Sequence, residues 1–357
     1  MTIVKSNICA PYKAELRLAA DIPPTPTRWL WEKWIPVGRL LILAGAGGSG
    51  KTTLAISIAA TISNGSQWPD GSGCAPIGNV LIWSGEDGIA DTVIPRLIAA
   101  GANLNRISIV EGRRAPDGKT RAFNPATDFD LLNAEAERIG NVALVILDPL
   151  VSLVRGDMHR ANDVRQALQT VVEFAERHNS AVIGITHLSK GARQGSIVDR
   201  VIGSQAFSAL ARTVLVAIKN PESETRALIK VKSNLSENRG GIGYVVEHAV
   251  VDADIETTCI AWGEVLDEEA EIIISEMNKT SKTLTRSAIQ DACNFLGEIL
   301  QNGSRPATEI EELSEAAGIS GATLKRAKRQ LGVSAKKIGM DAGWIWLLPE
   351  AITEGAH

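Results

Sequence analysis

Residues 40–52 read Leu-Leu-Ile-Leu-Ala-Gly-Ala-Gly-Gly-Ser-Gly-Lys-Thr, and the octet from Gly45 to Thr52 fills every fixed position of the pattern G-x-x-x-x-G-K-[ST]. Glycines let successive backbone N–H groups turn inward around phosphate oxygens, and a following helix adds its positive N-terminal end. The octet therefore predicts a loop that binds a nucleoside triphosphate.

The residues around the octet agree with this interpretation. Residues 40–44 are a short apolar run, as expected of a buried parallel strand, and residues 53–63 have the apolar content of a packed helix. Lys51 would reach the β and γ phosphates of ATP, and the Thr52 hydroxyl would hold Mg²⁺. We expect the nucleotide to be bound by Gly45, Ala46, Gly47, Gly48, Ser49, Gly50, Lys51, Thr52 and Thr53.

The composition narrows the class of protein. A chain of 357 residues is long enough for two domains, or for one large domain with an appendage. Its net charge of −4 means that a nucleic-acid surface must be local. The four cysteines lack metal-ligand spacing, and no apolar run approaches the roughly 20 residues that span a bilayer. We expect a soluble cytoplasmic protein with no membrane contact.

The chain divides into four parts by pattern. Residues 1–37 are irregular, and their tryptophans Trp29, Trp31 and Trp34 either cover a neighbouring subunit or pack on the core, so the segment is a candidate subunit-contact arm. Residues 38–265 alternate apolar strands with helical segments, which predicts an α/β core with a mainly parallel sheet. The expected strands are 39–44, 79–84, 107–110, 142–148, 181–187, 213–218, 226–232 and 242–248, the last few joined as antiparallel hairpins.

The C-terminal part follows a different plan. Residues 266–285 are expected to form an acidic helix and a polar linker, the latter at 278–283. Residues 286–350 then have the pattern of three helices and two strands around a turn, which is typical of a winged helix-turn-helix domain.

A second apolar strand supplies the carboxylate that a phosphate loop needs. Residues 142–148 end in Asp148, as in the Walker B pattern, where the aspartate holds a metal-bound water. Thr52 and Asp148 are therefore the expected metal site. In many such ATPases a catalytic glutamate follows this aspartate, but here the next residue is Pro149.

The catalytic base must then come from another strand. Residues 81–84 are apolar up to Ser84 and are followed by Gly85, Glu86 and Asp87, so a carboxylate here could reach the γ-phosphate through one water. We assign Glu86 as the base, with Asp87 as second choice.

A third strand, residues 181–187, ends in Thr186 and His187. His187 is either a satisfied core histidine or a sensor of the γ-phosphate. The loop that follows carries Lys190, Arg193 and Arg200, and the loop after Asp148 carries Arg155 and Arg160. Both loops are candidates for contact with the phosphates of DNA.

Two lysines, Lys230 and Lys232, fall on one face of an expected strand because side chains repeat with period two. They either form an ordinary exposed strand face or enter the nucleotide site of a neighbouring subunit. Arg212 is a further candidate for stabilising charge at that site.

Taken in order, these motifs resemble those of the RecA-fold ATPases, and within that group those of the RepA-type hexameric helicases of plasmids and phages. The resemblance covers roughly residues 38–250 and rests on the phosphate loop, Glu86, Asp148, Thr186-His187, Arg212 and the pair Lys230 and Lys232. It implies, in that order, phosphate binding, water activation, metal holding, γ-phosphate sensing and charge from the next subunit. It also implies a central channel for single-stranded DNA, lined by the two basic loops.

The C-terminal unit lies outside this resemblance to the small RepA core. Its cations follow an acidic stretch and suit contact with duplex DNA or docking of a replication protein; they are Lys325, Arg326, Lys328, Arg329, Lys336 and Lys337.

The resemblance implies a ring-forming, Mg²⁺-dependent ATPase that translocates on single-stranded DNA and unwinds duplex during replication of a plasmid, phage or integrated element. Two alternatives remain open. One is an ATP-switched DNA-binding regulator or recombination mediator without unwinding activity, and the other is a strand-exchange filament.

Overall fold

A nine-stranded sheet organises the chain. The computed structural model describes residues 15–188, 197–198, 205–220, 223–301, 303–337 and 343–349. The sheet has the order β13-β12-β11-β10-β3-β9-β8-β4-β5. Its six parallel strands are β10 (Thr213–Lys219), β3 (Leu40–Gly45), β9 (Ala181–His187), β8 (Val142–Asp148), β4 (Asn79–Ser84) and β5 (Ile107–Ile109).

Three antiparallel strands extend this parallel core. They are β11 (Arg226–Ser233), β12 (Arg239–Val251) and β13 (Ile255–Glu269), each paired with the strand before it in the chain. The expected α/β architecture, with a mainly parallel sheet and appended hairpins, is therefore confirmed.

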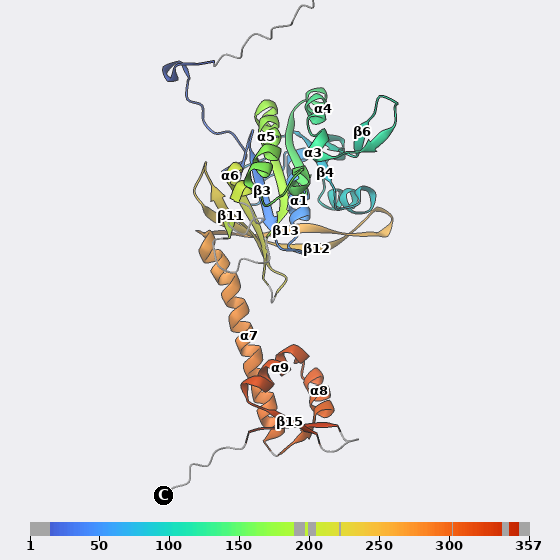
Figure 1. Cartoon of the computed structure of the whole chain (residues 1–357), viewed down its shortest axis with the longest axis vertical. Helices are drawn as coiled ribbons and strands as arrows, with labels where there is room; N and C mark the ends of the chain where they lie inside the picture. The colour runs from blue at the N-terminus through green and yellow to red at the C-terminus, as the bar shows by residue number, and fades with distance from the viewer. Residues whose placement is uncertain are drawn as a thin grey trace, which may run out of the picture.

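Both faces of the parallel part are covered, which explains why its strands are apolar throughout. In β3, Leu40 and Ile42 face one hydrophobic cluster while Leu41 and Leu43 face another. The first cluster receives α4 (Leu131–Ile139), α5 (Ala161–His178) and part of α6 (Gln205–Leu210). The second receives α1 (Lys51–Asn64) and α2 (Ile94–Ala99), so helices lie on both sides of the sheet (Figure 1).

The tryptophans near the N-terminus pack on the core. Strands β1 (Trp29–Trp31) and β2 (Ile35–Pro36) form a small hairpin in which Trp31 is fully buried. The Trp31 ring stacks on Trp34 at 5.1 Å and on Trp68 at 4.5 Å between centroids. Of the two interpretations of this cluster, core packing therefore holds for Trp31 and Trp34. Residues 15–27, which contain the turn η1 (Ala19–Asp21), are exposed.

The structure corrects the expected acidic helix and linker at 266–285. Strand β13 continues to Glu269, because it pairs with β12 over most of its length and holds β-branched residues such as Thr257, Thr258 and Ile260. Helix α7 then runs without interruption from Ala270 to Leu300, across the expected linker. Residues 270–296 contain no glycine or proline that would end a helix.

The C-terminal elements have a small core of their own. Helices α8 (Ala307–Ala316) and α9 (Gly321–Gln330) pack with the end of α7 around Leu296, Ile310 and Trp346. A three-stranded antiparallel sheet completes the unit, with β14 (Arg305–Pro306), β16 (Trp344–Leu347) and β15 (Ser334–Lys337) in that order. Figure 1 shows this unit at the far end of α7 from the large sheet.

Shorter elements connect the main ones. After β5 the chain forms the hairpin β6 (Gly112–Arg114) and β7 (Thr120–Ala122), and then α3 (Pro125–Asp128). A π-helix, η2 (Ile89–Val93), precedes α2, and η3 (Leu104–Arg106), η4 (Leu150–Leu153) and η6 (Asp252–Asp254) are short 3-10 helices. Within the described ranges, no helix combines the length and apolarity needed to span a bilayer.

Candidate functional site

The ends of four neighbouring strands bring the expected site residues together. Parallel strands place their carboxyl ends at one edge of the sheet, where ligands of open α/β sheets bind. Gly45, at the end of β3, lies opposite His187 at the end of β9. Ser84, at the end of β4, lies opposite Asp148 at the end of β8. The phosphate loop, the metal carboxylate and the candidate base therefore share one edge.

The phosphate loop depends on glycine at two points. A Cβ on Gly45 would lie 2.6 Å from Ser49 Oγ and 2.7 Å from the Ala217 oxygen, so a side chain does not fit there. Gly50 has a φ of +86°, a left-handed conformation that lets the chain turn directly into α1. Ser49 is buried, and its hydroxyl donates to the Ala46 oxygen at 2.9 Å. The loop is therefore held in a turn by its own backbone and by the Ser49 hydrogen bond.

The Lys51 ammonium group folds over this loop. Its Nζ donates to the Ala46 oxygen at 3.0 Å and lies 3.4 Å from His187 Nδ1. Burial lowers the pKa of Lys51, although the Asp148 and Glu86 carboxylates oppose the shift. A phosphate placed here would supply the negative charge that favours the protonated lysine.

Thr52 and Asp148 form the hydrogen bond at the centre of the site, with Thr52 Oγ1 donating to Asp148 Oδ2 at 2.6 Å. Burial raises the pKa of Asp148, helped by the charges of Glu86 and Asp87 and opposed by Thr52 and Lys51. A hydroxyl and a carboxylate side by side are the oxygen ligands that Mg²⁺ uses beside nucleotide phosphates. A cation here would offset the unfavourable burial of the carboxylate, so the residues fit Mg²⁺.

The two candidate bases differ in their partners. Asp87 forms an ion pair with Arg96 at 2.7 Å, and its backbone N–H donates to Ser84 Oγ at 3.1 Å. Glu86 is half exposed, and its Oε1 lies 4.0 Å from His187 Nε2. Glu86 is thus the carboxylate that is available to a water molecule, while His187 stands between it and Lys51.

Of the three cations expected to act on a neighbouring subunit, Arg212 lies at the edge of the sheet opposite the phosphate loop. Arg212 precedes β10, and its backbone N–H donates to the Leu40 oxygen at 3.1 Å, at the start of β3. From Leu41 to the end of β3 at Gly45 is four strand positions, about 13 Å at roughly 3.3 Å per residue. Arg212 is therefore distant from the phosphate loop of its own chain. Lys230 and Lys232 lie nearer the middle of the sheet, since they pair with Leu215 and Val214 of β10.

Both lysines already have partners within the chain. Lys230 is buried, lies 5.5 Å from the Trp34 ring centroid and donates to the Lys33 oxygen at 3.3 Å. Lys232 donates to the backbone oxygens of Ser208 and Ala211. Burial lowers the pKa of both lysines. Of the three cations only Arg212 is exposed, so of the two interpretations of the lysines the ordinary exposed strand face does not hold.

The candidate DNA contacts divide into three groups. Arg155 and Arg160 are exposed after β8; Arg155 Nε donates to the Ala126 oxygen at 2.5 Å, and Arg160 lies 3.8 Å from Asp157. Lys190, Arg193 and Arg200 lie outside the described residues.

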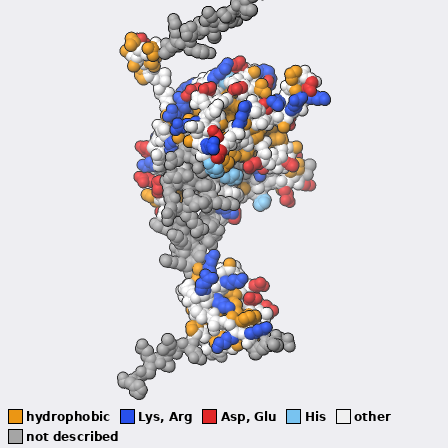
Figure 2. All heavy atoms as spheres, viewed as in Figure 1, with side chains coloured by type: hydrophobic (Ala, Val, Ile, Leu, Met, Phe, Trp, Pro, Cys, Tyr) orange, Lys and Arg blue, Asp and Glu red, His pale blue; other side chains and the backbone are white. Residues whose placement is uncertain are grey.

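The third group is in the C-terminal unit. Lys328 is turned inward, with its Nζ 3.7 Å from the Trp346 ring centroid, and burial lowers its pKa. The other five are exposed on α9 and β15, namely Lys325, Arg326, Arg329, Lys336 and Lys337. Figure 2 shows blue basic side chains on this unit, with red acidic side chains on another part of it.

Sequence reasoning missed the contacts that support the phosphate loop from β12. The Tyr244 hydroxyl is buried and donates to the Ser49 oxygen at 2.6 Å. A Cβ on Gly50 would lie 2.9 Å from Val246 Cγ2, so the next residue on this face also touches the loop. On β13, Trp262 Nε1 donates to Ser57 Oγ of α1 at 3.2 Å. No local motif signals these contacts, because the hydrogen bonds join residues 195 and 205 positions apart.

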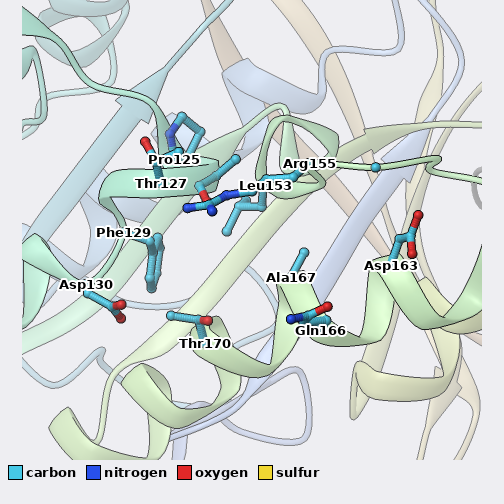
Figure 3. A pocket seen from close by; sticks show the side chains of 12 residues that line it. Pro125, Thr127, Phe129, Asp130, Leu153, Arg155, Asp163, Gln166, Ala167 and Thr170 are labelled. Carbon is cyan, nitrogen blue, oxygen red and sulfur yellow. The ribbon is translucent and has the colours of Figure 1, made fainter.

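A cavity of about 400 Å³ lies away from the phosphate loop. It is bounded by α3, the residues after η4 and the start of α5, and Figure 3 shows Arg155 beside Pro125 and Thr127 at its border. Because it includes no residue of the phosphate loop, we do not assign the nucleotide to it.

One protein-family model matches more than half of the chain. It is described as an AAA domain (AAA_25) and matches residues 11–193. No curated protein matches the sequence. Among solved structures, the RadB recombinase is similar at 17% identity with a TM-score of 0.41, over 62% of this chain and 91% of that one.

Replacing Tyr244 with Phe removes the donor to the Ser49 oxygen and keeps the ring. We expect about 1 kcal/mol less stability from the lost hydrogen bond, together with weaker nucleotide binding because the loop is less firmly held. Denaturant unfolding and a fluorescent ATP analogue measure the two effects.

Ser180→Ala is the matched control, since the Ser180 hydroxyl is also buried and donates to a carbonyl, that of Val142, at the opposite edge of the sheet. This variant should lose stability and keep its nucleotide affinity. Equal nucleotide affinity in Tyr244→Phe and wild type would contradict a role for Tyr244 in holding the loop.

Proposed function

The chain belongs to the AAA domain family, and from this premise we propose that it is a RecA-like, Mg²⁺-dependent ATPase whose hydrolysis drives movement along single-stranded DNA. The observation that carries the proposal is the Thr52–Asp148 contact of 2.6 Å beside Lys51. It joins the two halves of a phosphate and metal site at the carboxyl edge of the sheet.

In this proposal the loop binds the triphosphate through its backbone N–H groups and the N-terminus of α1. Lys51 would turn from the Ala46 oxygen toward the β and γ phosphates, and Thr52 and Asp148 would hold Mg²⁺. Mg²⁺ would neutralise charge on the phosphate oxygens. The helix end, the lysine and the buried carboxylate are positioned before the ligand arrives.

Glu86 acts as the general base for the attacking water. It is exposed at the carboxyl edge of the sheet and, among the residues that the structure describes, it pairs with no arginine, whereas Asp87 pairs with Arg96. His187 lies between Lys51 and Glu86, so it can respond to the γ-phosphate and transmit the change to the segment that follows β9.

Arg212 supplies positive charge to the nucleotide of the next subunit in a homo-oligomeric ring, which we propose to be a hexamer. Its exposure and its place at the edge opposite the phosphate loop support this role. Lys232 holds the backbone oxygens of Ser208 and Ala211 beside Arg212, and Lys230 holds the Lys33 oxygen. Either lysine would join Arg212 at the interface only if these contacts were released. The exposed segment 15–27 is a second candidate for subunit contact.

The DNA would pass along the loops after β8 and β9, past Arg155 and Arg160. The C-terminal unit, with its exposed cations on α9 and β15, would act as a winged helix that binds duplex DNA or a replication protein. Unwinding at a replication fork of a plasmid, phage or integrated element is the activity we assign to this arrangement.

A second function is favoured by one specific feature. Tyr244 of β12 contacts the phosphate loop, and β12 leads through β13 into α7 and the C-terminal unit. A chain built in this way could also be an ATP-switched DNA-binding regulator or recombination mediator, in which the nucleotide changes the position of the C-terminal unit and no strand is unwound.

The ATP hydrolysis rate with and without single-stranded DNA tests the main proposal. We expect DNA to stimulate hydrolysis and Lys51→Ala to abolish it, because the lysine contacts the transferred phosphate. Hydrolysis that is indifferent to DNA, or that survives Lys51→Ala, would contradict the motor. A forked-duplex unwinding assay then separates the two functions, since the switch predicts hydrolysis and DNA binding without strand separation.

Glu86→Gln should lower kcat roughly 100-fold or more while nucleotide affinity is retained, because a carboxamide cannot accept the proton from water. Asp87→Asn is the control, since it removes the carboxylate of the adjacent residue at the same edge of the sheet. Single-turnover kinetics and a nucleotide-binding assay measure both. The assignment fails if Asp87→Asn loses activity and Glu86→Gln does not.

Mixing two inactive variants tests the shared site. Arg212→Ala chains keep an intact phosphate loop, and Lys51→Ala chains keep an intact Arg212, so some interfaces in a mixed ring combine both intact halves. We expect the mixture to recover hydrolysis that neither variant has alone. A mixture that remains inactive, although exchange of labelled subunits is observed, would show that Arg212 does not act across an interface.

A further inference from the structure

The β6–β7 hairpin is a basic projection that the nucleotide site does not use. It leaves the carboxyl edge of the sheet shortly after the edge strand β5, and it stands clear of the body of the protein in Figure 1. Residues 112–122 contain four cations, at Arg113, Arg114, Lys119 and Arg121, and one carboxylate, at Asp117. Figure 2 shows blue basic side chains where the hairpin projects.

The outer cations are accessible. Arg114 and Lys119 are exposed, and within the described part of the chain their side chains have neither an ion pair nor a hydrogen bond. The Arg121 side chain is 60% exposed and lies 3.6 Å from Asp117. An exposed pair at that distance is weak and exchanges readily for another anion.

The hairpin is held in shape despite its charge. Its turn is closed by the Ala115 N–H donating to the Lys119 oxygen at 2.9 Å, with Gly118 at a φ of +80°. At its base, Arg113 pairs at 2.8 Å with the buried carboxylate of Asp128. Hydrogen bonds from the Asn124 backbone and Thr127, together with the charge of Arg113, lower the pKa of Asp128 against the effect of burial.

The charges on the hairpin lower its own stability. Arg113 and Arg121 are directly opposite each other in the antiparallel register, and like charges in such a pair are destabilising. Asp128 and Asp117 offset the repulsion from outside the pair. A hairpin needed only as a connection would not require cations at these positions, so their presence points to an anionic ligand.

The composition of the hairpin favours nucleic acid over a protein as that ligand. Residues 112–122 include no aromatic or large aliphatic side chain, whereas the centre of a protein interface is built from such groups. A narrow ribbon of arginine and lysine suits a phosphodiester backbone, because phosphate contacts need only positive charge and donors.

A short helix joins the hairpin to the loop after β8. Asp128, at the end of α3, binds Arg113 of the hairpin, and the Ala126 oxygen of the same helix accepts from Arg155. Both basic segments are therefore held by one turn of helix at the border of the cavity in Figure 3. A DNA strand bound at Arg155 would therefore lie near the hairpin, because α3 holds both segments.

We propose that the β6–β7 hairpin binds the phosphate backbone of single-stranded DNA through Arg114 and Lys119, as a contact additional to the loops after β8 and β9. This inference rests on the proposed function for the identity of the polymer. The hairpin would give the protein a DNA-binding surface that is separate from the phosphate loop and from the C-terminal unit.

The test compares Arg114→Gln/Lys119→Gln with Arg138→Gln/Arg177→Gln in the full chain. The control pair removes the same charge from exposed arginines on α4 and α5, near the opposite edge of the sheet. Binding of a fluorescent oligothymidine is measured over a series of salt concentrations with a non-hydrolysable ATP analogue, and thermal unfolding confirms that each variant is folded. ATP hydrolysis without DNA should be the same in all three proteins.

Loss of two phosphate contacts should lower the slope of log affinity against log salt by about 1.4, since each contact contributes about 0.7 on a single strand. Affinity at low salt should fall tenfold or more, and the control should match wild type. An unchanged slope in the hairpin variant, or an equal loss in the control, would overturn the proposal, as would wild-type protein that binds duplex and no single strand.

The DNA-binding and hydrolysis measurements distinguish failure of the hairpin proposal from failure of the proposed motor function. Hairpin-dependent binding with hydrolysis that ignores DNA would contradict the motor and support the hairpin. DNA-stimulated hydrolysis with hairpin-independent binding would contradict the hairpin alone. Absence of any DNA binding by wild-type protein would overturn both.

Discussion

The hydrogen bond from Thr52 to Asp148 is the interaction on which the site depends. It ties the first turn of α1 to the end of β8, and it holds a carboxylate that burial and two neighbouring acids make unfavourable to ionise. Lys51 is held beside it with a pKa lowered by burial. Burial thus disfavours both the charged lysine and the charged carboxylate. The phosphates of a nucleotide would stabilise the Lys51 charge, and a bound cation would stabilise the Asp148 charge.

The long hairpin of β12 and β13 makes this site part of a larger unit. Tyr244 and Val246 support the loop, Trp262 holds α1, and β13 continues into α7. A change in the loop on binding phosphate would act on the same strands that lead to the C-terminal unit. This continuity explains why a motor and a nucleotide switch are both compatible with one architecture, and why unwinding must be measured.

The sequence was sufficient wherever a local pattern determines the structure. Strands β8 and β9 were predicted to the residue, because apolar runs that end in a polar residue at a sheet edge have few alternatives. The sequence was insufficient where packing between distant segments determines which side chains are buried. A period-two pattern places Lys230 and Lys232 on one strand face, but it does not show that Trp34 and backbone oxygens contact them. Tyr244 carries no motif, and a polar stretch of α7 resembled a linker because local composition does not report helix continuity.

Imaging of the assembly formed with a non-hydrolysable ATP analogue on single-stranded DNA shows whether two chains share each nucleotide. We expect a closed ring, with nucleotide between Lys51, Thr52 and Asp148 of one chain and Arg212 of the next. An open filament, a monomer on DNA, or nucleotide bound without any residue of a neighbouring chain would contradict it.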